Sequence, residues 1–152
     1  MQAGHYVYIG GPAVELMPEY LSGVANQIGG DLHPLPLKRH NPDATFTSRG
    51  CPNQCRFCAV PLIEGDLREL TDWRPAPIVC DNNILATSQR HFDNAIDRLK
   101  QFRQVDFNQG LDARLLNAHH IDKLKELSLP ILRFSFDHIG MAPTVTSAIQ
   151  SV

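Results

Sequence analysis

The chain has 152 residues, of which 43% are hydrophobic and 20% are charged, and its formal net charge is -2. This length suits about one domain of ~100 to 200 residues, and the globular composition excludes a peptide hormone, a multidomain assembly and a disordered or collagen-like chain. Because acidic and basic residues nearly balance, no global positive field favours a nucleic acid or an anionic membrane, and either partner would need a local basic patch.

The N-terminal residues lack the charged and apolar blocks of a signal peptide. No stretch of the chain reaches the ~18 to 20 consecutive apolar residues of a membrane-spanning helix, so we predict a cytoplasmic protein with no membrane partner. A short aromatic and β-branched run at residues 6–9 is followed by Gly10, Gly11 and Pro12 and then by apolar residues at near-helical spacing. This pattern predicts a strand, a glycine turn and a helix within residues 1–28.

Residues 29–43 contain three prolines, two glycines and charges of both signs. Proline and glycine at this density interrupt regular structure, so we predict an extended linker. Its short basic run, Lys38, Arg39 and His40, is typical of a solvated linker and is a weak indication of nucleic-acid binding.

Four short, mostly apolar runs follow at intervals typical of βα units, at residues 44–47, 77–80, 105–107 and 131–136. Thr87 or Ser88 opens a predicted helix that carries one apolar stripe, and Asn117 caps a second helix that ends before Pro130. Helices that alternate with short strands predict an α/β fold with a parallel sheet, either open or curving into a barrel.

A further helix is predicted to begin near Met141, with Pro143 in its first turn. A complete eight-unit barrel takes about 250 residues, so the four βα units expected in residues 44–152 make about half of one. We therefore expect a truncated core whose missing partner is the remainder of the barrel.

Three of the four cysteines, Cys51, Cys55 and Cys58, lie on the loop after the first of these strands. Parallel βα proteins keep their active sites at this face of the sheet. Because a reducing compartment disfavours disulfides, the group predicts metal binding or redox chemistry. Thiolates are natural ligands for iron and sulfide, and three of them leave one coordination position open for a substrate or cofactor.

Other interpretations of the thiols stay open. Structural zinc completed by Cys80 or a nearby histidine would make the chain a zinc-stabilised, non-enzymatic binding module. Cys55 and Cys58 alone would suit a thioredoxin-like dithiol. Without such a role Cys80 is predicted to be a core thiol, and the paired histidines His119 and His120 are predicted to be solvated.

The segment SRGCPNQCRFCAVP, residues 48–61, matches the pattern C-x3-C-x-Φ-C and resembles the radical S-adenosylmethionine (radical SAM) superfamily. The similarity runs over roughly residues 44–140 and is greatest to members with a cobalamin-binding domain and to methylthiotransferases, although the extra cluster cysteines of a methylthiotransferase are missing. The resemblance implies an enzyme in which Cys51, Cys55 and Cys58 hold a 4Fe–4S cluster. S-adenosylmethionine would bind the open iron, with Phe57 beside its adenine.

The resemblance further implies a one-electron donor such as flavodoxin or ferredoxin. Reductive cleavage of S-adenosylmethionine would give a 5'-deoxyadenosyl radical, which abstracts hydrogen from a substrate that the sequence does not identify. Asp81 and Asn82 match the position that receives the cofactor's amino group, and Arg114 the position that binds its carboxylate. Ser135 and Asp137 are assigned to ribose or substrate contacts, and no residue is assigned a catalytic role.

Residues 1–28 resemble the last βα unit of a Rossmann-like cobalamin-binding domain. A single such unit forms no complete corrin site, so we predict no bound cobalamin. The resemblance therefore implies a βα remnant at residues 1–28, a linker at 29–43 and a truncated radical SAM core at 44–152, and we expect that core to form half of a TIM-like barrel.

Overall fold

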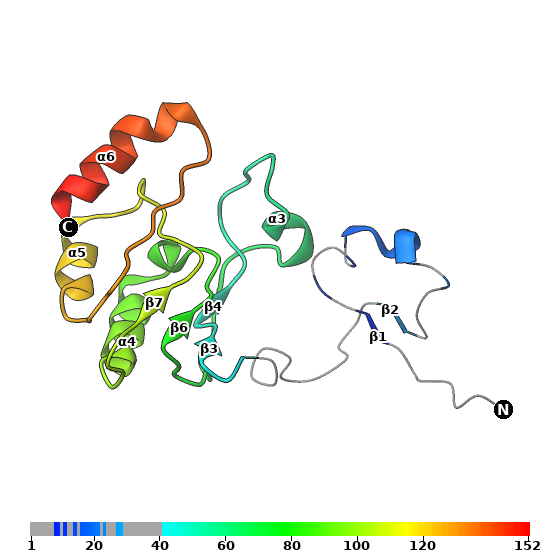
Figure 1. The fold of residues 1–152 in the computed structure, drawn as a ribbon, viewed down its shortest axis with the longest axis horizontal. Coiled ribbons are helices and arrows are strands. Elements are labelled where there is room, and N and C mark those ends of the chain that lie inside the picture. The colour runs from blue at the N-terminus through cyan, green and yellow to red at the C-terminus, as the bar shows by residue number, and fades with distance from the viewer. Residues whose placement is uncertain are drawn as a thin grey trace.

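The computed structural model describes residues 41–152 together with positions 8, 9, 11, 14, 16–21, 23, 27 and 28 (Figure 1). In the N-terminal unit, strand β1 (Tyr8–Ile9) pairs in parallel with β2 (Gln27–Ile28), and the 3-10 helix η1 (Pro18–Leu21) lies between them in sequence. β1 falls within the strand predicted at residues 6–9. The rest of that strand, and the predicted linker up to residue 40 with its basic run, lie outside the described residues.

The central element is a parallel three-stranded sheet in the order β3-β6-β7. Its strands are β3 (Ala44–Thr45), β6 (Ile78–Val79) and β7 (Asp106–Phe107). The register sets Ala44 opposite Ile78, and Ile78 opposite Asp106. Each strand lies inside a predicted run, so the predicted α/β class with a parallel sheet is confirmed. The fourth predicted strand contributes one parallel bridge, between Leu111 and Phe134.

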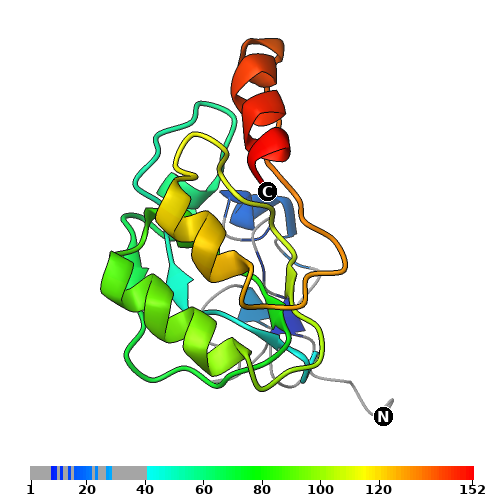
Figure 2. The ribbon, with the colours of Figure 1, turned by 90° about the vertical axis from the view of Figure 1, so that its left-hand side faces the viewer.

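Helices α4 (Gln89–Leu99) and α5 (Ala118–Leu124) lie side by side on one face of this sheet (Figure 2). Both begin where the sequence predicts, because the Ser88 side chain accepts from the amide of His91 and the Asn117 side chain accepts from the amide of His120. The 3-10 helix η3 (Ile139–Met141) leads into α6 (Ala142–Ser151), which carries the predicted early proline. None of the described helices has the length and apolar character needed to span a bilayer.

The core lies between α4, α5 and the sheet. It is built from fully or almost fully buried side chains of α4 and of the two strands beneath it, namely Phe92, Ile96, Leu99, Val79 and Phe107. Each side chain of this size contributes about 1.5 to 3 kcal/mol when it leaves water. This packing fixes the strands, and with them the loops that follow their carboxyl ends.

His120 belongs to this core, so the prediction that it is solvated is wrong. Its ring packs edge-on against Phe92, with ring centroids 4.7 Å apart, and its Nδ1 lies 3.0 Å from the Leu115 carbonyl oxygen. His119 stays half-buried and pairs with Asp93 at 2.6 Å. Both histidines lie in the first turn of α5, a position that is typically exposed to solvent. His120, however, lies on the face of α5 that packs against the core, as Leu124 does.

A small antiparallel pair extends from the sheet. β4 (Ser48–Arg49) pairs with β5 (Arg68–Glu69), and α3 (Val60–Ile63) lies in the connection between them. Neither β5 nor α3 was predicted, because two exposed charged residues give no apolar alternation and one helical turn gives no period. Residues 50–65 of this connection carry the three neighbouring cysteines, and we call them the cysteine loop.

Candidate functional site

Glu64 closes the base of the cysteine loop. Its carboxylate accepts from the Gly50 amide at 2.9 Å and from Arg49 Nη2 at 2.6 Å, and only 12% of its side chain is exposed. The amide of Cys51 donates to the Gly65 carbonyl at 3.2 Å. The two ends of the loop are therefore joined directly, which limits how far the thiols can move apart.

Gly50 is required by the geometry of this closure. Its φ is +75°, and a Cβ built on it would lie 2.2 Å from the carbonyl oxygen of Asp66. Any side chain would collide with backbone there, and a left-handed conformation adds strain. The glycine lets the chain enter the loop in close contact with Gly65 and Asp66, where the loop ends.

All three thiols of the loop line one cavity of about 150 Å³. The cavity also borders the segments that follow β6, β7 and Phe134, which lie at the carboxyl ends of the strands, as expected for a βα site. The lining residues are Cys51, Asn53, Cys55, Phe57, Cys58, Asn82, Asn83, Gly110, Asp112, Arg114, Ser135 and Asp137. Every site residue predicted from sequence except Asp81 lies in this set.

Asp81 is used inside the protein. Its buried carboxylate accepts from the Thr47 amide at 2.6 Å, from Thr47 Oγ1 at 2.5 Å and from Ser48 Oγ at 2.7 Å. Burial raises the pKa of Asp81, although these hydrogen bonds oppose the rise. The residue ties the end of β6 to Thr47, just before β4, and to Ser48, the first residue of β4, and the structure does not bring it to the cavity.

Its neighbours Asn82 and Asn83 do line the cavity. Asn82 Nδ2 donates to the Glu64 carboxylate at 2.6 Å, which links the loop after β6 to the base of the cysteine loop. Asn83 is 4% exposed, and its Oδ1 is the one buried side-chain oxygen or nitrogen without a partner in the described part of the chain. An unpaired buried acceptor lowers the stability of the fold by about 1 to 3 kcal/mol. A ligand that donates a hydrogen bond to this oxygen would therefore bind favourably.

Asp112 is the shared acceptor of the cavity wall. Its carboxylate accepts from Asn53 Nδ2 at 3.0 Å and from Asn83 Nδ2 at 3.2 Å, and from the Arg114 guanidinium through two bonds of 2.7 Å. Burial acts to raise the pKa of Asp112, but the hydrogen bonds from Arg114 and Asn53 outweigh it and lower that pKa. One buried anion thus connects the cysteine loop with the loops after β6 and β7.

Two polar side chains approach the thiols. Asn83 Nδ2 donates to Cys51 Sγ at 3.7 Å. Hydrogen bonding to Asp112 is the main reason that the pKa of Arg114 is raised, and Cys55 contributes in the same direction. Asn53, Asn83 and Asp112 were not assigned to the site from sequence, and their position after parallel strands or within the cysteine loop was the only available signal.

The fourth cysteine, Cys80, lies outside the cavity. It is half-buried and free, and burial raises the pKa of its thiol. Within the described ranges, no three His, Cys, Asp or Glu side chains are gathered tightly enough to hold a single metal ion. An iron–sulfur cluster is wider than one ion, so its thiolates need to surround a shared space, and three thiols on one cavity with no fourth cysteine suit that chemistry.

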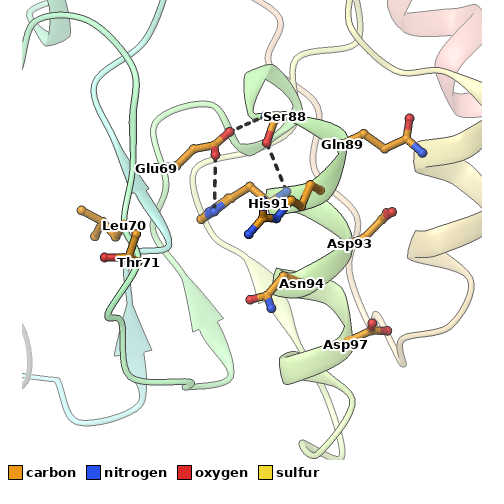
Figure 3. A pocket seen from close by; sticks show the side chains of 10 residues that line it. Glu69, Leu70, Thr71, Ser88, Gln89, His91, Asp93, Asn94 and Asp97 are labelled. Atoms are coloured by element: carbon orange, nitrogen blue, oxygen red, sulfur yellow. Dashed lines mark hydrogen bonds and ion pairs between the residues drawn. The ribbon is translucent and has the colours of Figure 1, made fainter.

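A larger pocket, about 1060 Å³, lies elsewhere, over α4 and β5 (Figure 3). Glu69 spans its edge, accepting from the Ser88 amide at 2.5 Å and lying 3.9 Å from His91 Nδ1. Its other carboxylates, Asp93 and Asp97, are already paired with a histidine and a lysine. None of the predicted site residues lines this pocket, so the smaller cavity is the candidate site.

The chain is similar to methylthiotransferases named ribosomal protein uS12 methylthiotransferase RimO. The RimO of Parasynechococcus marenigrum is 29% identical over an alignment of 134 residues, which covers 81% of this chain and 26% of that protein. The RimO of Prochlorococcus marinus is 27% identical over 124 residues (78% and 24%), and that of Gloeothece citriformis is 28% identical over 111 residues (68% and 22%). No family model matches the chain.

The chain therefore spans about a quarter of the length of these relatives. The similarity to methylthiotransferases predicted from residues 48–61 is confirmed.

Proposed function

We propose that this chain, which resembles the radical SAM methylthiotransferases, holds a 4Fe–4S cluster on Cys51, Cys55 and Cys58 and binds S-adenosylmethionine at the iron that no thiolate occupies. The observation that carries the proposal is the common cavity, where three thiols and Phe57 meet polar groups from the loops after β6 and β7. Thiolates match iron and sulfide, and a cluster with three protein ligands keeps one position free.

We assign the cofactor's amino group to the two asparagines. Among the described residues the buried acceptor Asn83 Oδ1 has no hydrogen-bond partner, and an ammonium donor would satisfy it. Asn82, assigned from sequence, lies beside it on the same cavity. Asp81, also assigned from sequence, has its carboxylate engaged by Thr47 and Ser48. We therefore propose that Asp81 acts by positioning the strand that enters the cysteine loop.

The remaining assignments concern the other side of the cavity. Arg114 is exposed, and the guanidinium that Asp112 orients can also face a carboxylate. Ser135 and Asp137 lie at the same cavity and are proposed to contact ribose or substrate. Phe57 is 68% exposed, which leaves its ring free to lie against an adenine.

When bound, the cluster would supply the electron that cleaves S-adenosylmethionine to a 5'-deoxyadenosyl radical. The protein residues would hold the cofactor in one orientation and keep water from the reacting groups. An electron donor such as flavodoxin or ferredoxin, and a reducing compartment such as the cytoplasm, belong to this proposal. We also propose that residues 44–152 form half of a barrel, preceded by a βα unit and a linker. Because the relatives are named uS12 methylthiotransferases, the proposal includes transfer of a methylthio group to a protein substrate such as uS12.

Anaerobic reconstitution with iron and sulfide tests the proposal. We expect about four iron and four sulfide per chain, loss of both in Cys55→Ala, and full content in Cys80→Ser. A colourless protein that holds one zinc, with a metal content that falls in Cys80→Ser, would support the zinc-stabilised binding module instead.

A further inference from the structure

We infer that Asn83 raises the reduction potential of the cluster by donating a hydrogen bond to the Cys51 thiolate. The inference rests on the proposed function, since it requires the cluster. It concerns a property that the thiol pattern does not determine, namely how readily the bound cluster accepts an electron.

The contact lies in the interior of the protein. Asn83 Nδ2 is 3.7 Å from Cys51 Sγ, a normal length for a bond to the large sulfur atom, and the two residues are 4% and 9% exposed. Cys51 is the only buried thiol of the three in the cysteine loop. In such a low-dielectric setting a donor acts on a sulfur charge more strongly than it does at the surface.

The orientation of the Asn83 amide is determined by its surroundings. Nδ2 also donates to Asp112 Oδ2 at 3.2 Å. Because both the thiolate and the carboxylate accept hydrogen bonds, the nitrogen and not the oxygen must face them. Asp112 is itself held by Arg114 and Asn53, so the amide is oriented before any cluster is bound.

Reduction adds negative charge that is shared between the cluster and its thiolate ligands. A donor on a ligand sulfur stabilises the reduced form more than the oxidised form, and hydrogen bonds to sulfur are among the factors that set the potential of iron–sulfur clusters. Removing the Asn83 donor should therefore make the cluster harder to reduce.

Asn53 supplies a matched control. It is also an asparagine on the cavity, and it donates to the same Asp112 oxygen, at 3.0 Å. In the described part of the chain its side chain makes no hydrogen bond to a thiol. Substituting either asparagine by leucine removes one bond to Asp112, but only Asn83→Leu removes the bond to sulfur.

The experiment is a redox titration of the reconstituted proteins, in which the electron paramagnetic resonance signal of the reduced cluster is measured at each potential. We expect Asn83→Leu to shift the midpoint potential to more negative values and Asn53→Leu to stay close to wild type. Equal shifts in the two variants, or no shift in Asn83→Leu with its cluster intact, would overturn the inference. A wild-type chain that assembles no cluster would instead contradict the proposed function and remove the inference with it.

A second measurement uses wild-type protein, so it does not depend on whether a variant keeps its cluster. Wild-type protein labelled with ¹⁵N only in asparagine side-chain amides should show a nitrogen coupled to the reduced cluster in hyperfine spectra. Absence of that coupling in a protein with a complete cluster would overturn the inference.

Discussion

The Glu64 carboxylate accepts a hydrogen bond from the Gly50 amide at 2.9 Å, and this contact joins the two ends of the cysteine loop. The same carboxylate holds the side chains of Arg49 and Asn82. A single, mostly buried anion therefore connects the entry of the loop, its exit and the opposite wall of the cavity.

We predict that Glu64→Ala lowers the free energy of unfolding by about 1 to 3 kcal/mol, because it leaves a backbone amide and two side-chain donors without their acceptor. Iron content after reconstitution should fall as well, since Glu64 no longer joins the two ends of the loop that carries the thiols. Urea unfolding and iron analysis measure the two effects.

Asp66→Ala is the control for Glu64. Asp66 is an exposed carboxylate next to the same loop, and it contributes only its backbone carbonyl to the hydrogen bonds of the described residues. Stability and iron content should stay near wild type. If the two variants behave alike, Glu64 does not have the role assigned to it.

The two glycines at the ends of the loop should respond differently to alanine. Gly50 and Gly65 both have positive φ, +75° and +71°, but an added Cβ meets backbone at 2.2 Å only at Gly50. We predict a loss of about 1 kcal/mol for Gly65→Ala from the left-handed conformation alone, and about 3 kcal/mol or more for Gly50→Ala, where the collision adds to it. Equal losses in thermal or urea unfolding would show that the close approach at Gly50 does not exist.

His120 should make folding sensitive to mild acid. Burial lowers the pKa of His120 below its usual value of 6.5, so the unfolded chain takes up a proton at a pH where the folded chain does not. Its contribution to stability is complete above the unfolded value and is lost as the pH falls below about 6.5. Urea unfolding of wild type and His120→Gln, at about pH 7.5 and about pH 5.5, measures this contribution.

Glutamine at position 120 keeps a donor for the Leu115 carbonyl but does not titrate. The stability advantage of wild type over His120→Gln should therefore shrink on going to the lower pH. An advantage that is the same at both pH values would mean that His120 is not buried in its neutral form.

The helix starts were predictable because capping is local. Ser88 and Asn117 each reach an amide three residues ahead. The sequence identified Asn117 as one cap and limited the other to Thr87 or Ser88. The gathering of the thiols with Arg114 was also predictable, since parallel strands bring the loops at their carboxyl ends together.

Contacts between distant segments were not predictable. Nothing in the sequence distinguishes Glu64 from a solvated glutamate, because its partners Gly50 and Asn82 are distant in the chain. Among three consecutive polar residues after β6, the sequence favoured Asp81 and Asn82 for the cavity, and of these two only Asn82 lines it. The structure buries Asp81 against Thr47 and brings Asn83 to the thiols, because the course of the backbone decides which side chain points where.

The proposed function requires that three thiolates hold a cluster and leave one iron open to S-adenosylmethionine. Its most direct test is the electron paramagnetic resonance spectrum of the reduced, reconstituted protein, recorded before and after S-adenosylmethionine is added. We predict a cluster spectrum that changes on addition of the cofactor and is absent from Cys55→Ala. A spectrum that saturating S-adenosylmethionine leaves unchanged, or a protein that forms no cluster, would contradict the claim.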